Sequence, residues 1–211
     1  MIRNTAVTVC GPLNVNKLGV TYVHEHLMVK PQLPDEYYIP YTLDDEAAST
    51  EETRSFSAAG GETLVEMTPI NYGRNVKAYQ RIAQATGVHV ICCTGFHKQL
   101  FMPPWFGDKT DGELYDILMD EVTNGLDDTE IHPGVIKLGT SFEEVTAAEK
   151  RSIEAVARVH RDTGIPISTH CDKGTMGMDQ LHLLEKHGVD PKNVLLCHID
   201  LSLIHISEPT R

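Results

Sequence analysis

The sequence predicts an α/β fold of the (β/α)8 TIM barrel type, incomplete, with about six of the eight strands present. Three observations support this class. Short β-rich segments recur along the 211 residues with helix-like segments between them. Several of these strands are nearly continuously apolar, as expected for strands that are covered on both faces. Polar residues stand at the ends of several strands, where a barrel of this type places its functional groups.

The expected elements alternate along the chain. Six segments are predicted to be strands: residues 21–27, 63–68, 89–95, 135–140, 165–170 and 194–199. Three segments between them are predicted to be helices, each followed by a glycine: residues 75–86, 146–163 and 176–187. The second of these helices opens with a capping box formed by Thr146 and Glu149. The order strand, helix, strand predicts parallel strands.

An open, doubly wound sheet is the alternative to a barrel. A nucleotide-binding sheet of that kind would have a glycine-rich phosphate loop after its first strand, but here the first strand ends in His24, Glu25 and His26. No such glycine motif follows any other predicted strand. The barrel is therefore preferred, and at roughly 250 residues for a full barrel the chain supplies about three quarters of one.

The composition limits the classes of partner. The formal net charge is −12 and there is no basic stripe, which argues against nucleic acid or an anionic membrane surface and leaves a small-molecule substrate. A hydrophobic content of 41% suits one sizeable core, so residues 1–200 are expected to form a single partial barrel domain. No signal peptide and no membrane-spanning segment is found, which predicts a cytoplasmic location. A homodimer is left open.

The last segment of the chain, residues 201–211, is interpreted as non-native. A DNA string that would encode these eleven residues resembles a transposon-end adapter used to build sequencing libraries. The natural sequence is therefore expected to be readable only to Asp200, and His205 receives no functional interpretation.

Two histidines on the first predicted strand suggest half of a metal site. His24 and His26 are two residues apart, so an extended strand projects both to one side, where two imidazoles can converge on one ion. The alternative is a pair of buried, hydrogen-bonded core histidines. His170 and His198 stand at the ends of the fifth and sixth predicted strands, and their presence favours the metal interpretation.

Lys137 is the least ordinary of the candidate residues because it interrupts the apolar run Val135–Leu138. An unpaired ammonium in a dry interior is costly, so this lysine must reach the rim, lower its pKa or change chemically. A neutral lysine amine can react with carbon dioxide to give a carbamate, an anionic oxygen ligand that can bridge two cations. The alternative is a lysine that reaches the barrel rim.

Together these motifs resemble the phosphotriesterase family of the amidohydrolase superfamily, over residues 11–200. The matching segments are residues 19–27, 73–75, 86–87, 94–95, 134–141, 168–170, 174–177 and 197–200. The resemblance implies two divalent metal ions, most commonly Zn²⁺, with Mn²⁺, Co²⁺ or Fe²⁺ as alternatives. Its implied ligands are His24, His26, Lys137 as a carboxylated bridging lysine, His170 and His198.

The resemblance also implies a function. It predicts a binuclear metal-dependent hydrolase that uses a metal-bridging hydroxide on a lactone or a phosphorylated sugar lactone, with phosphoric triester hydrolysis as the alternative. His97 and Lys98, after the third strand, are proposed contacts for an anionic substrate; alternatively Lys98 is a solvated loop residue. The family's strand-eight aspartate has no counterpart in this chain, and Asp172 and Asp200 match other positions. The chain is therefore expected to be inactive, and an inactive metal-binding remnant is the alternative of another class.

Overall fold

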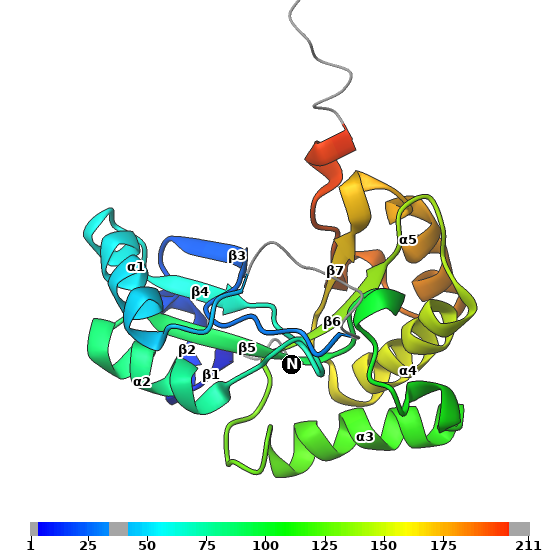
Figure 1. Ribbon diagram of the computed structural model, residues 1–211, viewed down its shortest axis with the longest axis horizontal. Coiled ribbons are helices and arrows are strands. Elements are labelled where there is room, and N and C mark those ends of the chain that lie inside the picture. The colour runs from blue at the N-terminus through cyan, green and yellow to red at the C-terminus, as the bar shows by residue number, and fades with distance from the viewer. Residues whose placement is uncertain (1–3, 34–41, 203–211) are drawn as a thin grey trace, which may run out of the picture. The chain divides into compact units, whose positions relative to one another are not determined.

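The computed structural model describes residues 4–33 and 42–202 (Figure 1). The chain divides into two compact units, one formed by residues 1–94 and 119–135 and the other by residues 95–118 and 136–211. Helix α3 (Asp111–Asn124) contributes residues 111–118 to the second unit and its remaining residues to the first. The single domain expected for residues 1–200 stays a prediction.

The first unit is built on three parallel strands that pair in chain order. These are β3 (Thr21–Glu25), β4 (Thr63–Glu66) and β5 (His89–Gly95), preceded by an antiparallel hairpin of β1 (Thr5–Thr8) and β2 (Gly11–Asn14). Helices α1 (Glu46–Ala58) and α2 (Val76–Thr86) lie side by side in Figure 1 and pack on each other. The apolar stripe of α2, including Tyr79 and Ile82, joins Val90 and Cys92 of β5 in one buried cluster.

The second unit repeats this arrangement. Strands β6 (Val135–Thr140), β7 (Ile167–Cys171) and β8 (Val194–Leu195) pair in parallel and in chain order. Helix α4 (Ala147–Thr163) follows β6, helix α5 (Gly177–Lys186) follows β7, and the two helices pack on each other. The 3₁₀ turns of the two units are Val15–Lys17, Gln99–Phe101, Phe106–Asp108, Asp172–Gly174, Pro191–Asn193 and Ile199–Ser202.

The helix boundaries follow the sequence signals. The side chain of Asn75 accepts the N–H of Ala78 at the start of α2, and Gly87 ends that helix with a φ of 76°. Thr146 and Glu149 form the predicted capping box of α4, and Gly164 ends this helix with a φ of 73°. Both glycines adopt the left-handed conformation that residues with a Cβ rarely take. The helix predicted at 176–187 is observed as α5.

All six predicted strands are present, two of them with the predicted bounds, but three end early for local reasons. The N–H of Leu27 donates to the Glu66 carboxylate and not to a strand, so β3 stops at Glu25. The same carboxylate accepts the N–H of Thr68 at 2.8 Å, which ends β4 at Glu66. His198 has a φ of 67°, so the segment after β8 turns away from extended structure. The β1–β2 hairpin, α1 and α3 were not predicted.

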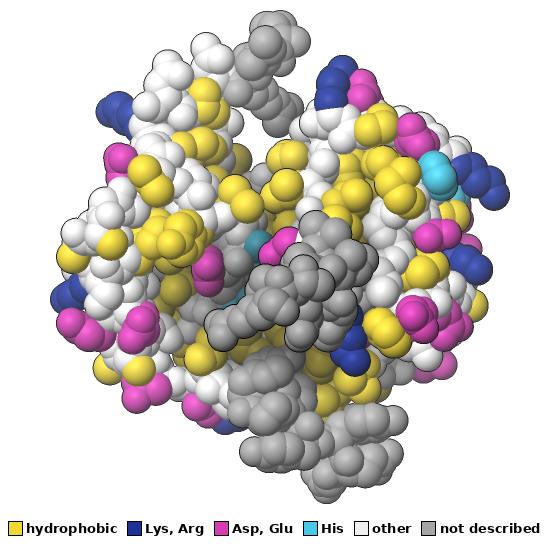
Figure 2. Space-filling view, turned by 90° about the horizontal axis from the view of Figure 1, so that it is seen from above, with side chains coloured by type: hydrophobic (Ala, Val, Ile, Leu, Met, Phe, Trp, Pro, Cys, Tyr) yellow, Lys and Arg dark blue, Asp and Glu magenta, His cyan; other side chains and the backbone are white. Residues whose placement is uncertain are grey.

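The charged side chains of the described residues are mixed on the face that Figure 2 draws. On the face drawn in Figure 2, the described Lys and Arg side chains are interspersed with Asp and Glu and form no stripe. No helix among residues 4–33 and 42–202 is long and apolar enough to cross a membrane. Residues 203–211 lie outside the described residues, so the non-native origin of 201–211 stays a prediction, as do the cytoplasmic location and the dimer.

Candidate metal centre

His24 and His26 lie at the end of β3 in the first unit. The strand register shifts between the pairs formed by Tyr22 and by Glu25, so the regular alternation expected for this segment is interrupted. The two imidazole rings nevertheless lie close together, with 5.5 Å between their centroids. His26 Nδ1 is 2.8 Å from the hydroxyl of Thr68, the residue two positions after β4. The H-x-H motif therefore gives the first unit two adjacent imidazoles.

Lys137 lies in the second unit, on β6, and its side chain is fully buried. Its backbone carbonyl accepts the N–H of Phe96 at 3.2 Å. The preceding residue, Gly95, has a φ of 110°, and a Cβ built there would lie 2.0 Å from the same carbonyl oxygen. Only glycine allows the chain to approach Lys137 this closely. The lysine does not reach the rim, which was the ordinary alternative for this residue.

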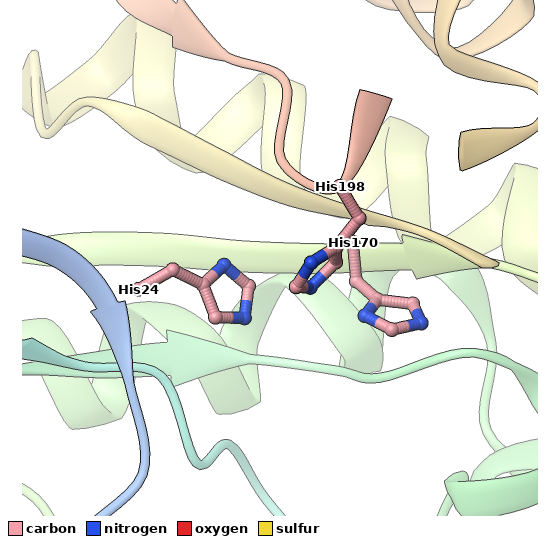
Figure 3. Close-up of side chains that lie close together, drawn as sticks. All are labelled: His24, His170 and His198. Atoms are coloured by element: carbon pink, nitrogen blue, oxygen red, sulfur yellow. The ribbon is translucent and has the colours of Figure 1, made fainter. Parts of the chain in front are cut away.

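His170 and His198 lie beside each other in the second unit. Figure 3 shows His170 on β7 and His198 on the segment after β8 with adjacent rings, and labels His24 on β3. The two ring centroids are 4.7 Å apart. Burial lowers the pKa of His170 to about 4, although the neighbouring Asp172 partly offsets this effect. Burial first, and the positive charge of Lys137 second, lower the pKa of His198. Both imidazoles are thus held neutral, which is the form that binds metal ions.

The Nε2 atom of His170 tests whether this group of side chains fits a cation. This atom is buried and forms no hydrogen bond in the described part of the chain, although a carboxylate oxygen of Asp172 lies 3.9 Å away. A buried polar atom without a partner costs free energy unless a ligand satisfies it. A neutral imidazole nitrogen of this kind, with a second imidazole alongside, is a donor set suited to a divalent transition metal such as zinc. The second unit therefore fits a metal ion.

His97 and Lys98 follow β5 and lie in the same unit as His170. The ring of His97 is buried, with its centroid 4.6 Å from that of His170, and its Nδ1 accepts the N–H of Lys98 at 2.7 Å. Lys98 Nζ lies 2.6 Å from a carboxylate oxygen of Asp172. The His170 ring first, and then the Lys98 ammonium, hold the pKa of Asp172 well below its usual range. Lys98 is therefore a partly buried, ion-paired residue rather than a fully solvated one.

Two buried polar residues that the sequence analysis did not assign to the site make hydrogen bonds that support this region. The carboxylate of Glu149, at the start of α4, accepts the Gln99 N–H at 2.9 Å and the Ser141 hydroxyl at 2.7 Å. The Gln180 amide of α5 donates to the carbonyl of His170 at 3.0 Å. The capping box signalled the first role in part, because it places Glu149 at the helix N-terminus. No sequence pattern signalled Gln180.

The fold and these side chains define a class: an α/β chain with histidines at or just after the ends of parallel strands and a fully buried lysine on a further strand. The chain belongs to the phosphotriesterase family, whose members match residues 4–208. Among its relatives is the phosphotriesterase homology protein of Escherichia coli, 34% identical over 190 residues, which span 90% of this chain and 65% of that protein. A phospho-furanose lactonase of Mycoplasmopsis synoviae is 31% identical over 95% of this chain and 61% of its own length.

Solved structures agree with this assignment. A lactonase from Listeria monocytogenes superimposes with a TM-score of 0.89 at 30% identity, covering 94% of this chain and 66% of that protein. This likeness confirms the predicted TIM-type α/β fold, of which the described residues supply six parallel strands. The chain spans 59% to 69% of the length of the curated relatives compared, so it covers about two thirds of them or less.

Proposed function

We propose that this protein is a metal-dependent hydrolase that binds two divalent cations and opens a lactone ring, with phosphorylated sugar lactones as the preferred substrate class. The proposed ligands are His24, His26, Lys137, His170 and His198. Zn²⁺ is the proposed metal because the histidine-rich donor set suits it. Relatives named as lactonases support the substrate class.

The observation that carries the proposal is the complete burial of Lys137 in an apolar strand of the unit that also holds His170 and His198. A buried ammonium that lowers the pKa of both imidazoles works against a cation site. Reaction with carbon dioxide removes this conflict. The ammonium first loses a proton to water. The nitrogen lone pair then forms a bond to the carbon of CO₂ while one C=O π pair moves onto oxygen, and the nitrogen releases a second proton to water, so a carbamate anion replaces a cation.

Two bound cations would polarise the substrate carbonyl and supply hydroxide near neutral pH. The side chains of the protein would keep the histidine ligands neutral and attract the substrate. His170 and His198 stay neutral at physiological pH because burial lowers the pKa of each. Lys98 uses one of its three N–H donors on Asp172, so its ammonium is held in place to attract a phosphate group on the substrate. The Nδ1 atom of His97 accepts the backbone N–H of Lys98. The proton of a neutral His97 ring is therefore on Nε2.

Metal content tests the ligand set directly. The purified chain, saturated with Zn²⁺ and freed of excess metal, should retain two ions per chain by elemental analysis, and Lys137→Ala should retain at most one. Lys150→Ala is the matched control, because Lys150 is an exposed lysine on α4. With ¹³C-labelled bicarbonate, a carbamate signal should appear in the unsubstituted chain and vanish only in Lys137→Ala. An unsubstituted chain that retains no metal contradicts the proposal.

Initial rates decide the substrate. A protein that contains this chain should turn over phosphorylated furanose lactones faster than aryl phosphotriesters, and the reverse preference would favour the phosphotriester alternative. Metal binding without turnover of either class supports the third hypothesis, an inactive metal-binding remnant.

A further inference from the structure

We infer that Thr68 and Glu66 are positioning residues for His26, and that together they fix which nitrogen of this imidazole faces a metal ion. The inference rests on the proposed function, in which His26 is a ligand. All the groups involved belong to the first unit. Neither Thr68 nor Glu66 is among the proposed ligands.

The Thr68 hydroxyl sets the tautomer of His26. Its oxygen is 3.0 Å from the carbonyl of Met28 and 2.8 Å from His26 Nδ1. A hydroxyl has a single proton, and the buried Met28 carbonyl can only accept. If the hydroxyl proton serves that carbonyl, the oxygen must accept from His26, so Nδ1 carries the ring proton. The lone pair of the neutral ring is then on Nε2, the nitrogen that would bind the cation.

Glu66 fixes the backbone on both sides of this contact. Its side chain is fully buried, and its two oxygens accept the N–H groups of Leu27 and Thr68, the latter at 2.8 Å. The residue after His26 and the residue that bonds its ring are thereby tied to one carboxylate. One carboxylate oxygen also lies 3.8 Å from His26 Nδ1. A negative charge at this distance favours a proton on Nδ1 and a cation beyond Nε2.

The charge of Glu66 also affects Tyr79, another buried residue of the first unit. Burial first, and then the charge of Glu66, raise the pKa of the Tyr79 hydroxyl well above its usual value. A buried carboxylate is expensive unless hydrogen bonds compensate it. The N–H groups of Leu27 and Thr68 supply such hydrogen bonds to the Glu66 carboxylate.

The tautomer of His26 is the first readout, because a merely structural role for Thr68 would not change it. The chain is labelled with ¹⁵N-histidine and examined free of metal by long-range ¹H–¹⁵N correlation at about pH 8, where an imidazole of ordinary pKa is neutral. His26 should show its proton on Nδ1. Thr68→Val should lose this preference and Thr68→Ser should keep it. An unsubstituted chain with the proton on Nε2 overturns the inference even if no variant folds.

Zinc affinity is the second readout, measured by competition with a chromophoric chelator on variants whose circular dichroism spectra match the unsubstituted chain. Thr68→Val and Glu66→Gln should each weaken binding by about 10- to 100-fold, while Thr68→Ser stays within about threefold of the unsubstituted chain. Glu62→Gln is the matched control, because Glu62 is an exposed glutamate immediately before β4. Unchanged affinity in Thr68→Val overturns the inference. If the unsubstituted chain binds no zinc but shows the expected tautomers, the proposed function fails and the positioning of His26 stands.

Discussion

Replacing Arg74 by methionine should lower the free energy of unfolding by about 3 kcal/mol. Arg74 immediately precedes Asn75, the N-cap of α2, and its side chain is only 5% exposed. It donates to the carboxylates of Glu121 and Asp127, with contacts of 2.5 and 2.6 Å, and to the carbonyl of Cys93 at 3.3 Å. Burial alone would lower the pKa of this guanidinium, but the two carboxylates raise it above its ordinary value. The charge is therefore kept in the folded state.

The magnitude follows from what the substitution leaves behind. Methionine fills most of the space but removes all donors. Glu121, with a side chain 14% exposed, then keeps the Thr94 hydroxyl at 2.6 Å as its one side-chain donor among the described residues. Leaving one partner of a buried ion pair uncompensated costs about 3–5 kcal/mol. The lower end applies because the Asp127 side chain is 39% exposed and can regain water.

Urea unfolding followed by far-ultraviolet circular dichroism measures this difference. Dichroism is required because the single tryptophan, Trp105, lies in the second unit and Arg74 in the first. Arg81→Met is the matched control, since Arg81 on α2 makes a comparable two-point contact with Glu46 at the surface. Exposed ion pairs contribute little, so this variant should change the midpoint much less. Equal effects of the two substitutions, or a loss below about 1 kcal/mol for Arg74→Met, would refute the assignment of a buried pair.

Two further outcomes are expected. Thr146→Ala should cost about 1 kcal/mol in urea unfolding by removing the N-cap of α4, while Thr146→Ser should cost far less. Of the five cysteines, only Cys10 is exposed, so iodoacetamide followed by mass spectrometry should label it first. Burial raises the pKa of the thiols of Cys92 and Cys171, and early labelling of either would contradict their placement.

Much of the fold could be predicted because its signals are local. Gly87 and Gly164 end α2 and α4 at the predicted positions, and the capping box of Thr146 and Glu149 is present as expected. Strands β5 and β6 have the predicted bounds, and every residue of both except the first of β5 is buried. Strands β3 and β4 end earlier than their apolar patterns predict, because the Glu66 carboxylate accepts the backbone N–H groups of Leu27 and Thr68. The first of these hydrogen bonds joins residues that are far apart in sequence, so the sequence pattern does not reveal it.

The elements that the sequence analysis missed have weaker patterns. Helix α1 has only one buried residue, Thr53, so it lacks the apolar stripe that identifies an amphipathic helix. The β1–β2 hairpin consists of two short strands with few buried residues. Both lie in the described part of the chain, and both are recognisable only from their pairing or packing with other elements.

For the candidate site, the proposed ligands could be predicted from the sequence, whereas the residues that support them could not. A proposed ligand such as Lys137 is visible in the sequence because a lysine is improbable within an apolar strand, and chemistry is the simplest reason for it. A supporting residue such as Gln180, which donates to the His170 carbonyl, has no such signature. Many buried amides serve ordinary packing, so only their bonding partners distinguish them. If ligand geometry depends on these supports, Gln180→Leu should weaken zinc binding. Gln99→Leu should not, because Gln99 is an exposed residue of the 3₁₀ turn Gln99–Phe101. Equal zinc affinity of the two variants would mean that His170 is held by β7 alone.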